Sequence, residues 1–148
     1  MVGVMTTAEV KEFFRQIRKE QSEITHLSEM IERERASLLP QAIQYDKEHI
    51  QVSPENLFES SMAKLTDMDT RLRESIKALK YRKAQAEEML FLLDNSDERE
   101  VMRWYYMDTK EGKLLKWDDV AKEMSYDTRH ILRIHGSAIV NLANKSCH

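Results

Sequence analysis

Two arginines stand one helical turn apart near the C-terminus, Arg129 and Arg133 of the stretch TRHILRIHGSAIVNLANK. Thr128, His130 and Ser137 lie beside them on the same predicted helix. A guanidinium donates two parallel hydrogen bonds to the edge of a guanine, and hydroxyl and imidazole groups bond to bases or phosphates. This group of side chains therefore favours contact with double-stranded DNA in the major groove.

The predicted helix has two unlike faces. A helical wheel places Ile131, Ile134, Ala138 and Leu142 on one face and Arg129, Arg133, Gly136 and Val140 on the other. The segment from Thr128 to Lys145 contains no acidic residue, whereas the preceding helix carries Asp118, Asp119 and Glu123. This segregation of charge favours DNA binding, with Lys116, Lys122 and Lys145 as weaker candidates for phosphate contacts. A solvated face with a few arginines is the alternative.

The elements that must position these side chains form a predicted helix-turn-helix. Its first helix begins at Trp117, and small Ala121 occupies the fifth position, where the two helices cross. Ser125 takes the turn position and Asp127 can cap the second helix. The expected apolar contacts are Val120, Met124, Tyr126, Ile131 and Ile134. An ordinary helical hairpin is the competing interpretation.

Two segments, SDEREVMRWYYM and LKWDDVAKEMSYDTRHILRIHGSAIVNLANK, resemble region 4 of bacterial sigma-70-type factors. That module binds the -35 promoter element and docks on the polymerase flap. The chain is more similar to small phage-encoded regulators that join a helical N-terminal half to a sigma region 4-like end, the ArpU and RinA type of late-gene activator. The resemblance implies a phage or prophage transcription regulator that binds DNA, with RNA polymerase as a second partner.

The chain departs from the sigma pattern at two places. Thr128 and Arg129 stand where housekeeping factors carry an arginine-glutamate pair, and VNLANK replaces an arginine-rich tail. We therefore expect a target other than the usual -35 sequence and fewer phosphate contacts. Nothing in the chain resembles the region that melts the -10 element, so it should not act as a complete sigma factor.

Composition and apolar spacing predict an all-α protein. Of the 148 residues, 33% are charged and only three are glycine and two proline, which favours long helices with large exposed surfaces. Heptad-like apolar stripes predict one helix over residues 7–39, from a Thr6–Glu9 capping box to a stop at Pro40, and a second from Ser53–Pro54. The long stretch between them allows an antiparallel hairpin, and the excess apolar stripe predicts a homo-oligomer, most simply a dimer.

The break at DNSDE divides the predicted domains. Residues 1–94 form the expected helical hairpin, for oligomerisation or interaction, and residues 95–148 form the helix-turn-helix domain. In the second domain Asn95 is a predicted cap, EREVMRWYYM a helix and DTKEGKLLK a loop.

Several classes of function lack support in the sequence. No phosphate-binding glycine loop, nucleophile setting or isolated carboxylate pair indicates an enzyme or a cofactor. His130 and His135 are five positions apart and project differently, so we expect no metal site, and His135 fits a packing role. No apolar run approaches a membrane span, and the single cysteine, Cys147, fits a reducing cytoplasm. The resemblance to phage regulators implies that this is the cytoplasm of a bacterial host.

Two other functions stay open. A DNA-packaging subunit resembling small terminases would also join a helix-turn-helix to oligomerising helices. A coiled-coil adaptor would instead bind a host or phage protein without DNA.

Overall fold

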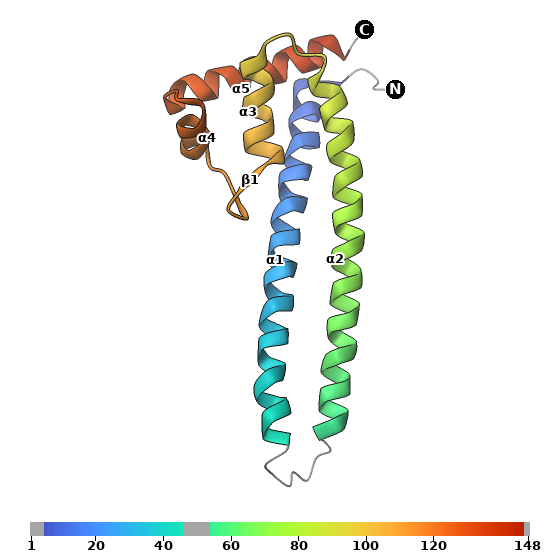
Figure 1. The fold of residues 1–148 in the computed structure, drawn as a ribbon. Helices are drawn as coiled ribbons and strands as arrows, with labels where there is room; N and C mark the ends of the chain where they lie inside the picture. The colour runs from blue at the N-terminus through green and yellow to red at the C-terminus, as the bar shows by residue number, and fades with distance from the viewer. Residues whose placement is uncertain (1–4, 46–53, 147–148) are drawn as a thin grey trace. The chain divides into compact units, whose positions relative to one another are not determined.

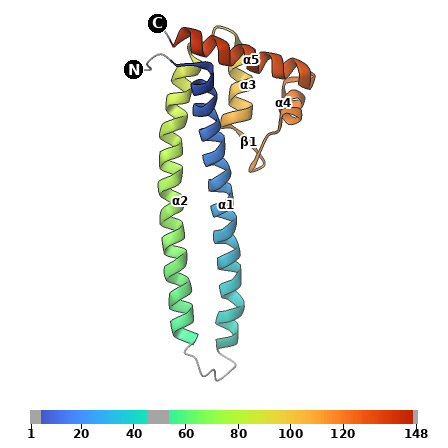
Figure 2. The same cartoon turned by 180° about the vertical axis from the view of Figure 1, so that it is seen from behind.

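The computed structural model describes residues 5–45 and 54–146, and the chain is all-α as predicted (Figure 1, and from behind in Figure 2). Its elements in chain order are α1 (Thr7–Tyr45), α2 (Pro54–Leu90), α3 (Ser96–Met102), a π-helical turn η1 (Arg103–Met107), β1 (Thr109–Lys110), β2 (Lys113–Leu114), α4 (Trp117–Met124) and α5 (Thr128–Lys145). None of the helices in these two ranges is long and apolar enough to span a membrane.

The start of α1 is confirmed by its capping box. The Thr6 hydroxyl accepts from the Glu9 N–H at 3.1 Å, and the Glu9 carboxylate accepts from the Thr6 N–H at 3.2 Å. The predicted stop at Pro40 is wrong, because α1 continues to Tyr45. A proline removes one backbone hydrogen bond and bends a helix without always ending it. The start of α2 at Pro54 is confirmed, while Ser53 and Cys147 lie outside the described residues.

The chain divides into two compact units, and the division differs from the predicted boundary after residue 94. Unit 1 comprises residues 1–22 and 78–148, and unit 2 comprises residues 23–77. The start of α1 and the end of α2 therefore belong with the C-terminal helices. The physical reason is a shared core, in which fully buried Phe14 of α1 lies against Tyr106 of η1 with ring centroids 5.6 Å apart.

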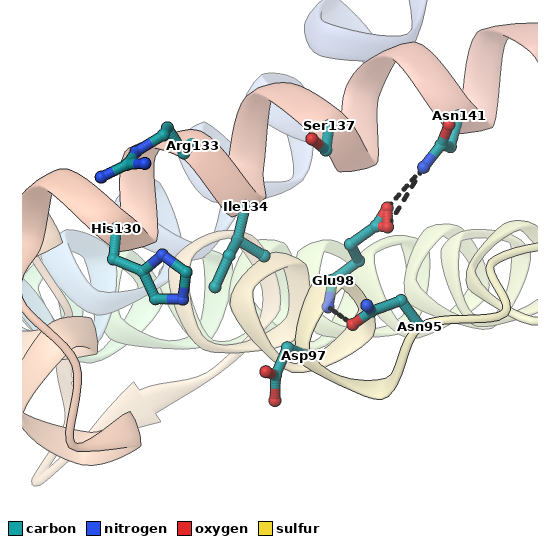
Figure 3. A pocket seen from close by; sticks show the side chains of 8 residues that line it. All are labelled: Asn95, Asp97, Glu98, His130, Arg133, Ile134, Ser137 and Asn141. Atoms are coloured by element: carbon teal, nitrogen blue, oxygen red, sulfur yellow. Dashed lines mark hydrogen bonds between the residues drawn. The ribbon is translucent and has the colours of Figure 1, made fainter.

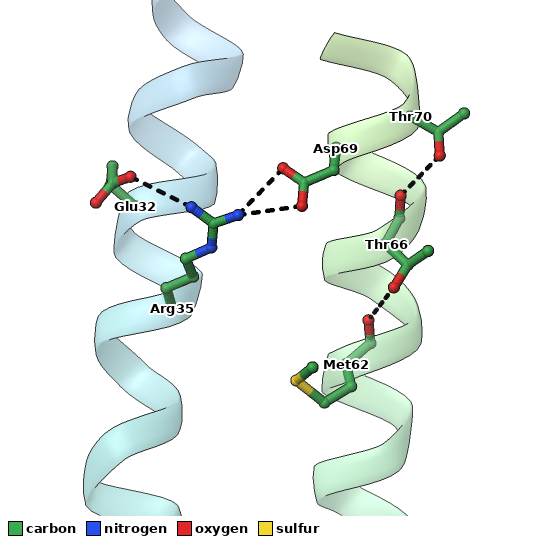
Figure 4. Close-up of polar contacts among 6 residues, drawn as sticks. All are labelled: Glu32, Arg35, Met62, Thr66, Asp69 and Thr70. Atoms are coloured by element: carbon green, nitrogen blue, oxygen red, sulfur yellow. Dashed lines mark hydrogen bonds and ion pairs between the residues drawn. The ribbon is translucent and has the colours of Figure 1, made fainter. Parts of the chain in front are cut away.

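Unit 2 is a pair of helical segments held by a narrow apolar seam. Ile31 and Leu38 of α1 and Leu65 of α2 are buried together. Beside them, the Arg35 guanidinium meets the Asp69 carboxylate at 3.1 Å and Glu32 at 3.6 Å (Figure 4). These charged side chains are largely exposed, so the apolar seam carries most of the stability.

The apolar stripe predicted for α2 is buried only in part. In unit 2, Phe58, Met62 and Ile76 are all more than 40% exposed. In unit 1 the same stripe is buried at Leu79, Ala86 and Leu90. The predicted stripe is therefore buried more completely in unit 1 than in unit 2.

The segment predicted as a loop contains a short β-hairpin. Thr109 pairs with Leu114 and Lys110 with Lys113 in an antiparallel register. The two connecting residues, Glu111 and Gly112, have φ of 54° and 77°. Positive φ at both positions is the type I′ turn, whose twist matches that of two antiparallel strands.

Candidate nucleic-acid interface

A tight turn joins α4 to α5. Ser125 has φ 59° and ψ 39°, in the left-handed region, and its N–H bonds back to the Ala121 carbonyl, as does that of Tyr126 at 3.0 Å. Two residues later the Asp127 carboxylate accepts from the His130 N–H at 2.8 Å and caps α5. The expected turn and cap are both confirmed, and they fix where α5 begins relative to α4.

Buried side chains pack α4 against α5. Val120 and Ala121 of α4 and Ile131 of α5 share a core with Val101 of α3 and Leu115. Ala121 is only 4% exposed. The small residue predicted at the helix crossing is therefore buried in this core, as the helix-turn-helix pattern requires.

Tyr126 does not make the predicted apolar contact. It is 38% exposed, and its hydroxyl donates to the Asp97 carboxylate at 2.7 Å. Its ring meets the His130 ring edge-on, with centroids 4.7 Å apart. The left-handed residue before it turns the chain, so the side chain lies over the start of α3 instead of entering the core.

The outer face of α5, defined as Arg129, Arg133, Gly136 and Val140, is exposed along its whole length. His130 and Ser137 flank it and are exposed as well. Across the described parts of the chain, no hydrogen bond or ion pair is recorded for the side chains of Arg129 and Arg133. Both guanidinium groups are available to a partner outside the chain.

The Thr128 side chain forms a hydrogen bond within the protein. It is half-buried, and its hydroxyl donates to the Asp118 carboxylate at 2.7 Å. This bond ties the first residue of α5 to α4. Thr128 therefore positions the neighbouring Arg129 and is a weaker candidate for base contact than the sequence indicated.

One edge of the outer face borders a pocket whose α3 side is acidic and whose α5 side carries Arg133. His130, Arg133 and Ser137 line it from α5, and Asp97 and Glu98 from α3, around a volume of about 390 Å³ (Figure 3). The Glu98 carboxylate accepts from the Asn141 side chain at 2.6 Å. The carboxylates of α3 disfavour an anion on this side of α5.

The three lysines expected to contact phosphates lie apart from the outer face. Lys116 and Lys122 line a different pocket, between the β-hairpin and α4. The Lys145 ammonium group pairs with the Asp94 carboxylate at 2.5 Å, and this bond lowers the pKa of Asp94. These lysines are not brought together with Arg129 and Arg133.

Cations that the sequence interpretation missed lie on the opposite edge of α5. Lys11, Arg15 and Arg18 of α1 line a pocket together with Leu132 and His135 of α5. Their spacing of four and three residues indicated a shared helical face, but no local signal indicated which distant helix that face would meet.

Potential metal ligands do not cluster in the described residues. Among residues 5–45 and 54–146, no group of three histidine, cysteine or acidic side chains is arranged to hold a metal. No protein-family model, curated protein or solved structure matches the chain.

Proposed function

We propose that this chain is a sequence-specific DNA-binding transcription regulator, and that the outer face of α5 enters the major groove. The observation that carries the proposal is the pair of exposed guanidinium groups at Arg129 and Arg133, which have no partner among the described residues and lie on a helix that begins at a capped tight turn. Arginine is the side chain best suited to bind guanine edges, and a helix fits the major groove.

Gly136 is a second observation in support. It lies within α5 on the outer face, where glycine costs about 0.5–1 kcal/mol relative to alanine. An added Cβ would meet nothing within 4 Å, so packing inside the protein does not require the glycine. Close approach of an external partner to the helix backbone is a physical reason for it.

The likeness to sigma region 4 extends the proposal to a phage or prophage regulator that also contacts RNA polymerase. A dimer would join two such helices and raise affinity for a site with two halves. No catalytic role is part of the proposal.

Replacing Arg133 with alanine is expected to weaken binding to the cognate duplex by about 1–3 kcal/mol, or about 5- to 150-fold. The reason is the loss of hydrogen bonds to a base edge, so binding to random duplexes should change much less. The site is first selected from random duplexes, and affinity is then measured by fluorescence anisotropy. Arg129→Ala is measured in parallel.

The control is Arg73→Ala, which removes the same charge from an exposed position of unit 2. It should leave both affinities nearly unchanged. If no sequence is enriched, or if Arg129→Ala and Arg133→Ala both preserve the preference for the selected site, α5 is not the recognition helix. The adaptor function would then be favoured, whereas a ring-sized oligomer bound to DNA would favour the packaging subunit.

Gly136→Ala is expected to raise the free energy of unfolding by about 0.5–1 kcal/mol and to weaken binding to the selected duplex. Stability rises because alanine has the higher helix propensity, and binding falls because the methyl group occupies the space needed for the groove. Chemical denaturation and anisotropy measure the two effects. Ser75→Ala, an exposed change in α2, is the control and should leave binding unchanged. Unaltered binding by Gly136→Ala would contradict close approach at this position.

A further inference from the structure

A pocket of about 230 Å³ in unit 1 is formed by α1, η1, α4 and α5. Three cationic side chains, Lys11, Arg15 and Arg18, line it from α1. None of its lining residues is acidic. It differs in this respect from the pocket on the other edge of α5, which Asp97 and Glu98 line.

The positive charge in this pocket is not neutralised within the described residues. No ion pair or hydrogen bond is recorded there for the side chains of Lys11 and Arg15, and both are exposed. Elsewhere in unit 1 comparable cations are paired, as Arg82 is with Glu20 and Arg103 with Glu87. Three close like charges repel one another in the folded protein, so an anion in the pocket would remove an unfavourable interaction.

Arg18, the third cation, packs against the ring of Tyr105. The Arg18 guanidinium carbon lies 3.9 Å from the centre of the Tyr105 ring, and one of its N–H groups donates to the Tyr105 carbonyl. Tyr105 in turn stacks on Trp117 at 3.6 Å, with the rings only 4° from parallel. An arginine has five N–H donors, so fixing this side chain leaves others to bind a phosphate at little entropic cost.

The pocket borders the outer face of α5. Leu132, which is 45% exposed, and His135 line it from that helix. Arg133 and Gly136 follow these residues in the chain, and Leu132 and Gly136 are one helical turn apart. A duplex whose major groove receives the outer face would therefore bring a sugar-phosphate strand to this edge of the helix.

We propose that the pocket lined by Lys11, Arg15 and Arg18 binds a backbone phosphate of the DNA whose groove receives α5. The inference rests on the proposed function and names the phosphate contact that the sequence assigned to other lysines. Such a contact orients a protein on DNA and carries no base preference, so it complements the contacts of Arg129 and Arg133.

The test compares Lys11→Gln and Arg15→Gln with Lys19→Gln, an exposed cation of α1 that does not line the pocket. Affinities for the selected duplex and for random duplexes are measured by anisotropy at several salt concentrations. Lys11→Gln and Arg15→Gln should weaken binding to both duplexes by a similar factor. Each variant that loses a phosphate contact should also flatten the plot of log affinity against log salt by about 0.9 units. Lys19→Gln should keep the wild-type slope.

The outcomes separate failure of this inference from failure of the proposed function. If the wild-type protein binds DNA but both pocket variants keep its salt slope, the phosphate contact is wrong and the proposed function stands. If the wild-type protein binds no DNA, both are wrong. Titration with inorganic phosphate, followed by the NMR signals of His135 and Trp117, tests the source of the anion. Phosphate binding without any change in the DNA slope would identify a free-anion site and would also overturn the proposal.

Discussion

Replacing Phe14 with alanine is expected to lower the free energy of unfolding of the C-terminal helices by about 3–5 kcal/mol. The ring of Phe14 is fully buried, 5.6 Å from the ring of Tyr106 and 5.4 Å from that of Phe13. Truncation would remove buried apolar surface and leave a cavity beneath η1. Phe14 and Tyr106 are 92 positions apart in the chain, so the substitution would destabilise helices far from it in sequence.

Chemical denaturation followed by tryptophan fluorescence measures this effect directly. Trp104 and Trp117, the two tryptophans of the chain, both pack against the core of the C-terminal helices. Phe58→Ala is the matched control, because Phe58 is 41% exposed and lies in unit 2. Its effect on the tryptophan transition should be below about 1 kcal/mol. A wild-type transition for Phe14→Ala would mean that residues 95–148 fold without α1.

Lowering the pH from about 7.5 to 4.5 is expected to cost about 2–3 kcal/mol of stability through His135 alone. His135 is buried, and its Nε2 shares a 2.7 Å hydrogen bond with the Tyr106 hydroxyl. Burial first, and then the positive charges of Lys11 and Arg15, lower the pKa of His135 to about 4. The Trp117 ring, 4.7 Å away, adds no charge to compensate.

The direction of this pH effect follows from proton binding by His135 in the folded and unfolded states. An unfolded histidine has a pKa of about 6.5, so between pH 6.5 and about 4 the unfolded chain binds a proton that the folded chain does not. Stability from this group is therefore fully present above pH 6.5 and falls as the pH falls through that window. Carboxylates also titrate at the acidic end, so the wild-type curve alone does not isolate the histidine.

His135→Gln isolates it, because glutamine retains hydrogen-bonding capacity and does not titrate. Between pH 7.5 and 4.5 the wild-type protein should lose about 2–3 kcal/mol of unfolding free energy relative to His135→Gln. Tyr106→Phe is the second comparison, since it removes the shared hydrogen bond and leaves the imidazole buried. The free energy of unfolding of Tyr106→Phe should be about 1 kcal/mol lower than that of the wild-type protein at every pH, and its pH dependence should be unchanged. A pH-independent difference for His135→Gln would contradict the lowered pKa.

The sequence by itself determined the starts of several helices. The Asn95 side chain accepts a hydrogen bond from the Glu98 N–H at 3.2 Å. The caps at Thr6 and Asp127 likewise join a side chain to the N–H three positions later. A side-chain cap joins atoms that are close in the chain, so its residues identify it without knowledge of the fold. The helix-turn-helix spacing was predictable for the same reason, because its crossing residue and its turn lie within one short segment.

Local signals failed where two outcomes were both physically allowed. Pro40 permits either an end or a bend of the helix, and α1 continues beyond it. Glu111 and Gly112 permit either an open loop or a hairpin turn, and the short strands on either side pair. In both places the neighbouring structure decided between the two.

Only the tertiary structure decided which apolar and basic faces meet. The stripe through Val10 and Phe14 has the same heptad-like character as the one through Ile31, yet the first joins the C-terminal unit and the second does not. Hydrophobic burial is not directional, so periodicity identifies a buried face without identifying its partner. Arg18 meets Tyr105 across 87 positions of the chain, and the pocket lined by Lys11, Arg15 and Arg18 depends on that packing. The candidate recognition residues Arg129 and Arg133 could therefore be proposed from a single helix, whereas the basic edge beside them required the fold.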